Sequence, residues 1–262
     1  MRFARFLVLL LGFVFLYGPI LILAAMSFNA SKLVTVWGGF STKWYVALLD
    51  DAAMLNAAKI SLSVAALSAV IATLLGLAAA VALARFGAFR TRGLFLGAVY
   101  APLVLPEVVL GLALLSAFVA FGFERGFVTL VIAHATFTMC FTSVVLLAAL
   151  RARDPSQEEA AMDLGATPMR AFALVVLPAI APSLASAFLL AFTLSLDDLV
   201  IASFTTGPGA TTLPMRIYSQ VRLGVTPEVN AISTLLLGFV GLILAISALA
   251  LNRPAREIVG SS

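Results

Sequence analysis

Long runs of hydrophobic residues alternate with short polar segments along the whole chain. A helix needs about 20 apolar residues to cross ~30 Å of hydrocarbon, and the hydropathy pattern predicts six such spans. The predicted spans are residues 6–26, 60–84, 93–121, 127–150, 183–204 and 231–251. The pattern therefore predicts an all-α integral membrane protein with six transmembrane helices and both termini on the same side.

The composition agrees with a membrane protein and excludes several other classes. Of 262 residues, 63% are hydrophobic and 11% are charged, which lies far outside the range of soluble globular domains. The net charge of +4 comes largely from arginines in short clusters between apolar runs, a pattern typical of topology signals rather than of a nucleic-acid surface. The single cysteine, Cys140, excludes an internal disulfide and a cysteine metal cluster.

The third run is too long for one straight helix and contains Pro102 and Pro106. Proline removes a backbone donor and clashes with the preceding turn. We therefore expect a kink or a break in this span near the two prolines.

Lysine and arginine in short loops mark the cytoplasmic side of a membrane protein. With the N-terminus inside, the cytoplasmic basic residues are Arg2, Arg5, Arg85, Arg90, Arg92, Arg151, Arg153, Arg170, Arg253 and Arg256. The outer ones are Lys32, Lys43, Lys59, Arg125, Arg216 and Arg222. This bias predicts that both termini are cytoplasmic.

The longest polar connection on the predicted cytoplasmic side joins the fourth and fifth spans. Asp154 and Pro155 are typical of a helix start, and Gly165 is typical of a helix end that needs a left-handed residue. Thr167 and Pro168 then predict a second short helix. Apolar side chains remain on these helices outside the membrane, so we expect a partner to cover them. They are Ala160, Ala161, Met162, Leu164, Met169 and Phe172.

The same loop resembles the "EAA" loop of binding-protein-dependent ABC importer permeases. The matching residues are Glu159, Ala160, Ala161, Gly165, Val175, Leu177 and Pro178. The resemblance implies that residues 155–176 form coupling helices that sit in a cleft of a cytoplasmic ATPase, with Gly165 at the bend. The residues expected to take part in coupling are Glu158, Glu159, Ala160, Ala161, Asp163, Gly165, Leu177 and Pro178. The alternative is an amphipathic helix lying on lipid headgroups.

No catalytic site is predicted within the chain. A Walker A loop needs Gly-Lys, and none of Lys32, Lys43 or Lys59 follows a glycine. His134 is the only histidine, and the sequence contains neither a Ser-His-Asp arrangement nor a set of metal ligands. We therefore expect a transporter subunit without cofactor or metal, whose ATP is bound and hydrolysed by a partner.

Three acidic residues, Glu107, Asp197 and Asp198, fall within apolar spans, where a charge costs at least ~2.5–3.5 kcal/mol on insertion scales. Glu107 lies about 14 residues after Gly93, and Asp197 about 14 after Ser183, so helical rise puts both ~21 Å above the cytoplasmic face. Neighbouring helical residues point ~100° apart, so Asp197 and Asp198 are not expected to face a pore together. These carboxylates predict a path for a cation. The alternative is that they pair with arginines of a partner helix or with backbone donors.

Further segments resemble the permeases of polyamine importers, and among them the second permease subunit of putrescine importers. These segments are residues 27–37, 101–111, 194–214 and 224–231, together with the coupling loop. The resemblance implies a polyamine path that includes Glu107, Asp197, Asp198, Ser195 and Trp44. Glu107 replaces the aspartate of the family and reaches one methylene further. Trp44 is expected to offer a cation–π face or to belong to the interfacial aromatic belt; His134 is expected to be a hydrogen-bonded packing residue.

The resemblance also implies the methionine-permease-like type I importer fold in a bacterial inner membrane. The implied assembly is a heterodimer with a second permease subunit, two copies of the ATPase and a periplasmic binding protein. Putrescine and spermidine are both compatible with the acidic path. Three alternatives remain: a permease for iron, thiamine or another solute; a proton-driven secondary transporter using Glu107, Asp197 and His134; and a membrane scaffold that only recruits an ATPase.

Overall fold

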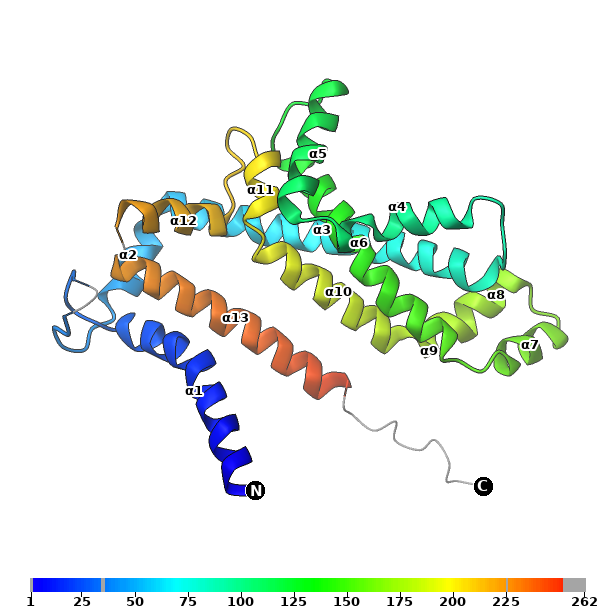
Figure 1. The fold of residues 1–262 in the computed structure, drawn as a ribbon, viewed down its shortest axis with the longest axis horizontal. Coiled ribbons are helices and arrows are strands. Elements are labelled where there is room, and N and C mark those ends of the chain that lie inside the picture. Colours follow the sequence, from blue (N-terminus) through cyan, green and yellow to red (C-terminus); the bar gives the residue numbers. More distant parts are fainter. Residues whose placement is uncertain (1, 34–35, 225, 252–262) are drawn as a thin grey trace. The chain divides into compact units, whose positions relative to one another are not determined.

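Helices make up the regular structure of the chain (Figure 1). The computed structural model describes residues 2–33, 36–224 and 226–251. Over these residues the only pairing of the β type is an isolated bridge between Asn29 and Phe40. The predicted all-helical class is confirmed. Arg253 and Arg256, two arginines assigned to the cytoplasm, lie outside the described residues, as do residues 34, 35 and 225 of the family-like segments.

The chain divides into two compact units. The central unit is Ala57–Met215, and the terminal unit combines Met1–Asn56 with Arg216–Ser262. Two helices, α3 (Ala52–Arg85) and α12 (Leu213–Leu223), have residues in both units. Each unit has its own packed helices and is described by itself.

The terminal unit contains α1 (Arg2–Met26), α2 (Lys43–Asp50) and α13 (Pro227–Leu251). α13 packs against both α1 and α2. Apolar side chains of α1 are widely exposed, with Phe15 at 82% and Leu21 at 67%. Such a surface is suited to lipid rather than to water.

A buried asparagine organises the loop between α1 and α2. The side-chain oxygen of Asn29 accepts hydrogen bonds from the backbone N–H groups of Ser31 (3.1 Å) and Gly38 (2.8 Å). Its amide nitrogen donates to the carbonyl oxygen of Val36 at 2.8 Å. Because Asn29 is fully buried, these bonds satisfy a polar group that would otherwise destabilise the loop.

The central unit is built around α6 (Phe127–Arg151). It packs against α4 (Arg92–Val104), α5 (Glu107–Ala120), α10 (Ala181–Leu196) and α11 (Val200–Thr205). Each of three apolar clusters includes residues of α6, represented by Leu130, Leu146 and Phe137. The connection from α6 to α10 contains α7 (Ser156–Asp163), α8 (Pro168–Ala171), the π-helix η1 (Phe172–Val176) and α9 (Leu177–Ala179).

Within the described residues, four helices are long and apolar enough to cross a membrane, and up to six spans result if each of two bent pairs counts as one. In the first bent pair, the chain bends by 119° between α4 and α5. Pro106 precedes α5 in an extended conformation, so the break expected near Pro102 and Pro106 is confirmed. The bend also invalidates the estimate that placed Glu107 and Asp197 at one level, because that estimate assumed a straight helix from Gly93.

The fifth run is not one continuous helix through residue 204. α10 ends at Leu196 and α11 begins at Val200, so Asp197 and Asp198 lie in the break between them. The ~100° argument for their directions therefore does not apply, because it needed both residues in one regular helix. The break follows from local chemistry, since an aspartate side chain can replace the backbone acceptors of the first helical turn.

We predict that Gly76→Ala destabilises the packing of α3 against α6. A Cβ at position 76 would lie 2.1 Å from the Thr142 hydroxyl oxygen and 2.9 Å from the Ser143 backbone nitrogen. The expected loss is about 1–3 kcal/mol, as in other overpacked sites, measured as a lower thermal unfolding temperature of the purified protein. Gly97→Ala in α4 is the control, because no atom lies within 4 Å of the added carbon. Equal unfolding temperatures for both variants would contradict the predicted close packing.

Candidate functional site

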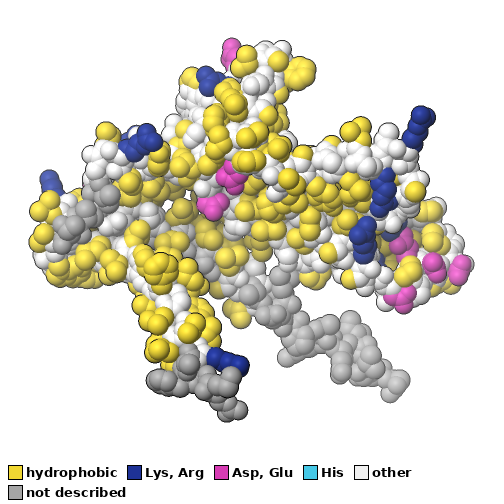
Figure 2. All heavy atoms as spheres, in the orientation of Figure 1, with side chains coloured by type: hydrophobic (Ala, Val, Ile, Leu, Met, Phe, Trp, Pro, Cys, Tyr) yellow, Lys and Arg dark blue, Asp and Glu magenta, His cyan; other side chains and the backbone are white. Residues whose placement is uncertain are grey.

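Two carboxylates lie exposed beside helix breaks of the central unit. Glu107 is the first residue of α5, and Asp197 immediately follows the last residue of α10. Both side chains are exposed, and α5, which Glu107 begins, packs against α11, which follows Asp197 and Asp198. Figure 2 shows acidic side chains near α11 on a mainly hydrophobic surface. The carboxylates predicted for the path are therefore brought together, although not by the straight-helix geometry expected for them.

Tight packing between α5 and α11 holds this arrangement. A Cβ on Gly111 of α5 would lie 2.6 Å from the ring of Phe204 in α11, so only glycine permits the observed contact. The Thr129 hydroxyl at the start of α6 donates to the carbonyl oxygen of Thr205 at 2.8 Å, which ties the end of α11 to α6. The second helices of the two broken segments, α5 and α11, thus pack together and against α6.

Asp198 differs from Asp197 in that it is buried, with 7% of its surface exposed. Its carboxylate accepts hydrogen bonds from the backbone N–H groups of Ala202 (2.8 Å) and Ile201 (3.3 Å). These two groups belong to the first turn of α11, which has no intrahelical acceptors for them. Asp198 therefore caps α11 and stabilises the break.

A buried polar network from three helices lies beside Asp198, although the Nε2 atom of His134 that faces it makes no hydrogen bond to any described residue. His134 in α6 places Nε2 3.3 Å from Oδ2 of Asp198, while its Nδ1 is 2.7 Å from the Ser195 hydroxyl in α10. The Ser68 hydroxyl in α3 donates to the Ser195 oxygen at 3.0 Å. The expectation that His134 is a hydrogen-bonded packing residue is confirmed. Ser195 is 4% exposed, so in this structure its hydroxyl bonds to protein groups rather than facing an open path.

Ser68 was not identified from the sequence. Its only signal there is a small polar residue within the long apolar run of α3, and serine commonly bonds to its own helix backbone in such runs. Ser68 does approach the Ala65 carbonyl oxygen at 3.2 Å, but the contact with Ser195 spans 127 positions of the sequence. A contact of that range leaves no local pattern.

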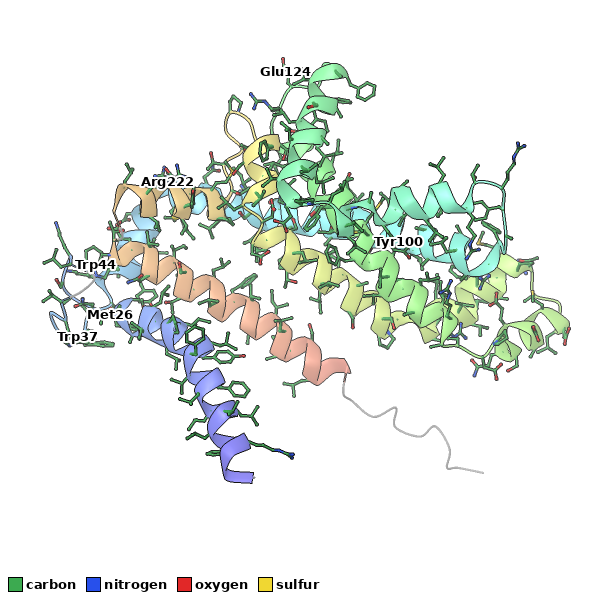
Figure 3. The ribbon with its side chains drawn as sticks, in the orientation of Figure 1. Met26, Trp37, Trp44, Tyr100, Glu124 and Arg222 are labelled. Carbon is green, nitrogen blue, oxygen red and sulfur yellow. The ribbon has the colours of Figure 1, made fainter. Side chains whose placement is uncertain are left out.

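Trp44 lies in the terminal unit, at the same end of it as Trp37 (Figure 3). The Trp44 indole N–H donates to the Asn29 carbonyl oxygen at 2.7 Å, and 8% of the residue is exposed. The ammonium of Lys43 lies 4.6 Å from the ring centroid. Trp44 therefore helps to fix the loop around Asn29, and its contact with a transported cation stays a prediction. Trp37 is 53% exposed.

The loop between α6 and α10 has much of the local structure that its sequence predicts. Oδ1 of Asp154 accepts from the Ser156 N–H at 3.0 Å, and this hydrogen bond lowers the pKa of Asp154 below its ordinary value. Gly165 has φ of +91°, and the Thr167 hydroxyl accepts from the Arg170 N–H at 3.4 Å. The two short helices, the start of the second at Thr167 and Pro168, and the left-handed glycine between them are confirmed. The first helix begins at Ser156 with Pro155 at its N-cap, one residue later than predicted.

The surface of this loop is open and apolar. α7 has no buried residue, and Leu164 (90%), Met169 (75%) and Leu174 (74%) are strongly exposed. Glu159 and Asp163 are exposed as well, whereas Glu158 pairs with Arg85. Pro178 is exposed, and Leu177 beside it is half-buried. Exposed apolar patches of this kind mark interaction sites.

The described residues include no group of three or more His, Cys, Asp and Glu side chains that could hold a metal ion.

A family model described as "Binding-protein-dependent transport system inner membrane component" matches residues 72–256. The chain belongs to this family. It is thus a multi-pass inner-membrane component of an ABC transport system, as the sequence resemblance predicted.

Curated relatives within this family cover most of the chain. The "Putrescine transport system permease protein PotI" of Escherichia coli (strain K12) is 55% identical over 245 residues, or 91% of this chain and 87% of that protein. The "Spermidine/putrescine transport system permease protein PotC" of the same strain is 42% identical over 225 residues, or 86% of this chain and 85% of that protein.

Solved structures establish the fold of this binding-protein-dependent component. A bacterial ABC transporter that imports alginate has a chain with a TM-score of 0.70 and 18% identity, covering 97% of this chain and 96% of that one. A chain of the MetNI methionine ABC transporter has a TM-score of 0.62 and 19% identity, covering 76% of this chain and 93% of that one. The predicted ABC importer permease fold is therefore confirmed in its general architecture.

We predict that Ser195→Ala lowers stability, because it leaves the buried His134 Nδ1 without the hydroxyl that satisfies it. The loss of a partner for a buried polar group costs about 1–3 kcal/mol, to be measured by thermal unfolding of the purified complex. Ser203→Ala in α11 is the control, since Ser203 is exposed and bonds only to its own helix, at the Leu199 carbonyl. Unchanged unfolding together with lost uptake would instead make Ser195 a residue of the transport path.

Proposed function

We propose that this chain is a permease subunit of an ATP-driven polyamine importer, in which Asp197 and Glu107 contribute to the path of the cation. The observation that carries the proposal is the pair of exposed carboxylates beside two helix breaks, within an otherwise apolar region. Carboxylates can replace the hydration that a cation loses in a membrane path. The sequence identity of 55% to a putrescine permease and of 42% to a spermidine/putrescine permease supports a polyamine as that cation.

The three acidic residues would have different tasks. Asp198 is buried and caps α11, which supports a role in shaping the path rather than in binding the substrate. Asp197 is exposed, and no side-chain hydrogen bond restrains its carboxylate among the described residues. Asp197 and Glu107 are therefore the better candidates for direct contact with an ammonium group.

In the proposed topology, six spans place both termini in the cytoplasm, with each of the two bent pairs of helices counted as one span. Arginines at positions 85, 90 and 92, and at 151 and 153, then lie on the cytoplasmic side together with the coupling helices of residues 155–176. The positive-inside bias supports this orientation.

The proposed assembly pairs this chain with a second permease subunit, two copies of an ABC ATPase and a periplasmic substrate-binding protein. The exposed apolar loop supports an ATPase partner, to which Glu159, Asp163 and the nearby Ala160 and Ala161 would be presented. A structural relative was crystallised with a substrate-bound periplasmic protein, which supports a similar partner here. The chain would hydrolyse no ATP itself, since it has no Gly-Lys pair for a Walker A loop.

Alternating access would link these parts. Closure of the ATPase dimer would displace the coupling helices and switch the path between inward and outward states. The left-handed Gly165 allows the chain to turn between α7 and α8, so it sets the geometry of the surface that the ATPase would contact.

We predict that Asp197→Asn reduces ATP-dependent putrescine and spermidine uptake by roughly ten- to a hundred-fold, the equivalent of a lost hydrogen bond to a charged group at about 1.5–3 kcal/mol. Uptake is measured with radiolabelled substrate in vesicles that contain the whole transporter. Asp50→Asn is the matched control, because Asp50 is an exposed aspartate at the end of α2.

Unchanged uptake in Asp197→Asn would remove this residue from the path. Uptake that follows a proton gradient without ATP would overturn the importer assignment. ATP turnover without uptake of either polyamine would leave the permease assignment in place and exclude these substrates.

We predict that Gly165→Val uncouples ATP hydrolysis from transport. A residue with a Cβ at φ of +91° is strained by about 1–2 kcal/mol, although no neighbouring atom lies within 4 Å to clash with it. Polyamine transported per ATP hydrolysed should fall in reconstituted vesicles. Gly165→Asn should retain more coupling, because asparagine tolerates a left-handed backbone better than valine. Equal coupling in both variants would argue against a role of this turn.

A further inference from the structure

Arg85 contacts two parts of the coupling segment at once, where the coupling segment denotes residues 155–176. It is the last residue of α3, and its Nη2 lies 2.7 Å from Oε2 of Glu158 in α7. Its guanidinium carbon lies 4.8 Å from the ring centroid of Phe172, the first residue of η1. One side chain therefore connects a long helix to both sides of the turn at Gly165.

The environment strengthens both contacts. The side chains of Arg85 and Glu158 are 31% and 18% exposed, so water only partly screens their charges. A guanidinium can pair with a carboxylate and lie over an aromatic ring at the same time, because it is planar. Lysine offers the charge without this planar geometry.

Little apolar packing supports α7 at this place. A cavity of about 180 Å³ lies beside it, lined by Arg85, Leu150, Arg153, Pro155 and Val176 among others. α7 itself packs against α8 and η1 of the coupling segment. The ion pair between Arg85 and Glu158 is thus a direct polar link from α7 to a membrane helix.

The helix that carries Arg85, α3, also reaches the network beside Asp198. α3 is continuous from Ala52 to Arg85 and contains no proline. Ser68 lies 17 residues before Arg85, or about 25 Å along the helix axis, and donates to Ser195 in the network around Asp198. The C-terminal end of α3 is held in turn by Arg92, whose guanidinium donates to the Leu83 carbonyl at 3.1 Å.

We propose that Arg85 is a positioning residue for coupling, which transmits movement of the coupling segment through α3 to the network at Asp198. Glu158 is the partner through which Arg85 acts, while the neighbouring Glu159 stays exposed for the ATPase. This inference rests on the proposed function for the direction of coupling, but not on the identity of the substrate.

A substrate-independent reporter tests the proposal. Ser203→Cys places a thiol on the exposed side of α11, and the native Cys140 is buried, so labelling of this chain by a membrane-impermeant maleimide, read after its separation from the other subunits, reports on position 203. The assembled transporter is labelled with and without ATP in three backgrounds: Arg85→Gln, Glu158→Gln and the double variant. Arg90→Gln is the control, because it removes the charge of an exposed arginine in the turn between α3 and α4.

In the otherwise unchanged transporter and in the control, ATP should change the labelling rate. In Arg85→Gln and Glu158→Gln this change should be lost, and polyamine moved per ATP should fall roughly five-fold or more, the lower bound of usual coupling between sites. ATP hydrolysis and the unfolding temperature should stay close to those of the control. The double variant should lose no more than either single variant, because both act through one contact.

A normal ATP response in both single variants would overturn the proposal, and so would losses that add in the double variant. If the glutamine variants do not assemble, Arg85→Lys and Glu158→Asp take their place. Each keeps its charge but changes the geometry of the contact, so a reduced ATP response supports the proposal and a normal response in both variants overturns it. An ATP response without polyamine transport would refute the polyamine assignment alone, because the labelling needs no substrate.

Discussion

Inside a membrane, every backbone N–H and C=O must find a partner within the protein, and this constraint determines where the helices of this chain can break. The break between α10 and α11 is possible because Asp198 accepts from the N–H groups of Ile201 and Ala202. At the other end of α11, the Thr129 hydroxyl donates to the carbonyl oxygen of Thr205. At this break, side chains thus replace the lost backbone partners, whereas the break before α5 occurs at Pro106, which has no backbone N–H to satisfy.

The same constraint explains why the candidate site lies at these breaks. A carboxylate within an unbroken apolar helix would face lipid or a packed neighbour, whereas a break exposes polar backbone and allows charged residues to face a path. Asp198 is held by the N–H groups of α11, and Nε2 of His134 lies 3.3 Å away, while Nδ1 of His134 bonds to Ser195. Because these contacts occupy Asp198, the neighbouring Asp197 is the carboxylate that remains open.

The sequence predicted what depends on local chemistry. Apolar runs predicted the helical class, Pro106 predicted the break before α5, and Asp154, Gly165 and Thr167 predicted the turns of the coupling segment. The break at Asp197 was missed because hydropathy averages over about 20 residues and does not register three non-helical ones. The 119° bend between α4 and α5 likewise removed the basis for counting helical rise. Contacts such as Ser68 with Ser195 join residues 127 positions apart, so no local pattern predicts them.

Two pairs of adjacent acidic residues divide their tasks in the same way. In the coupling segment, Glu158 binds Arg85 while Glu159 is exposed; at the helix break, Asp198 caps α11 while Asp197 is exposed. In each pair the member bound to the protein fixes the backbone, and this determines the position of its free neighbour. A free carboxylate on a fixed backbone loses less conformational entropy when it binds a partner than one on a mobile loop. In the proposed function, the protein-bound member of each pair therefore contributes to recognition without touching the partner.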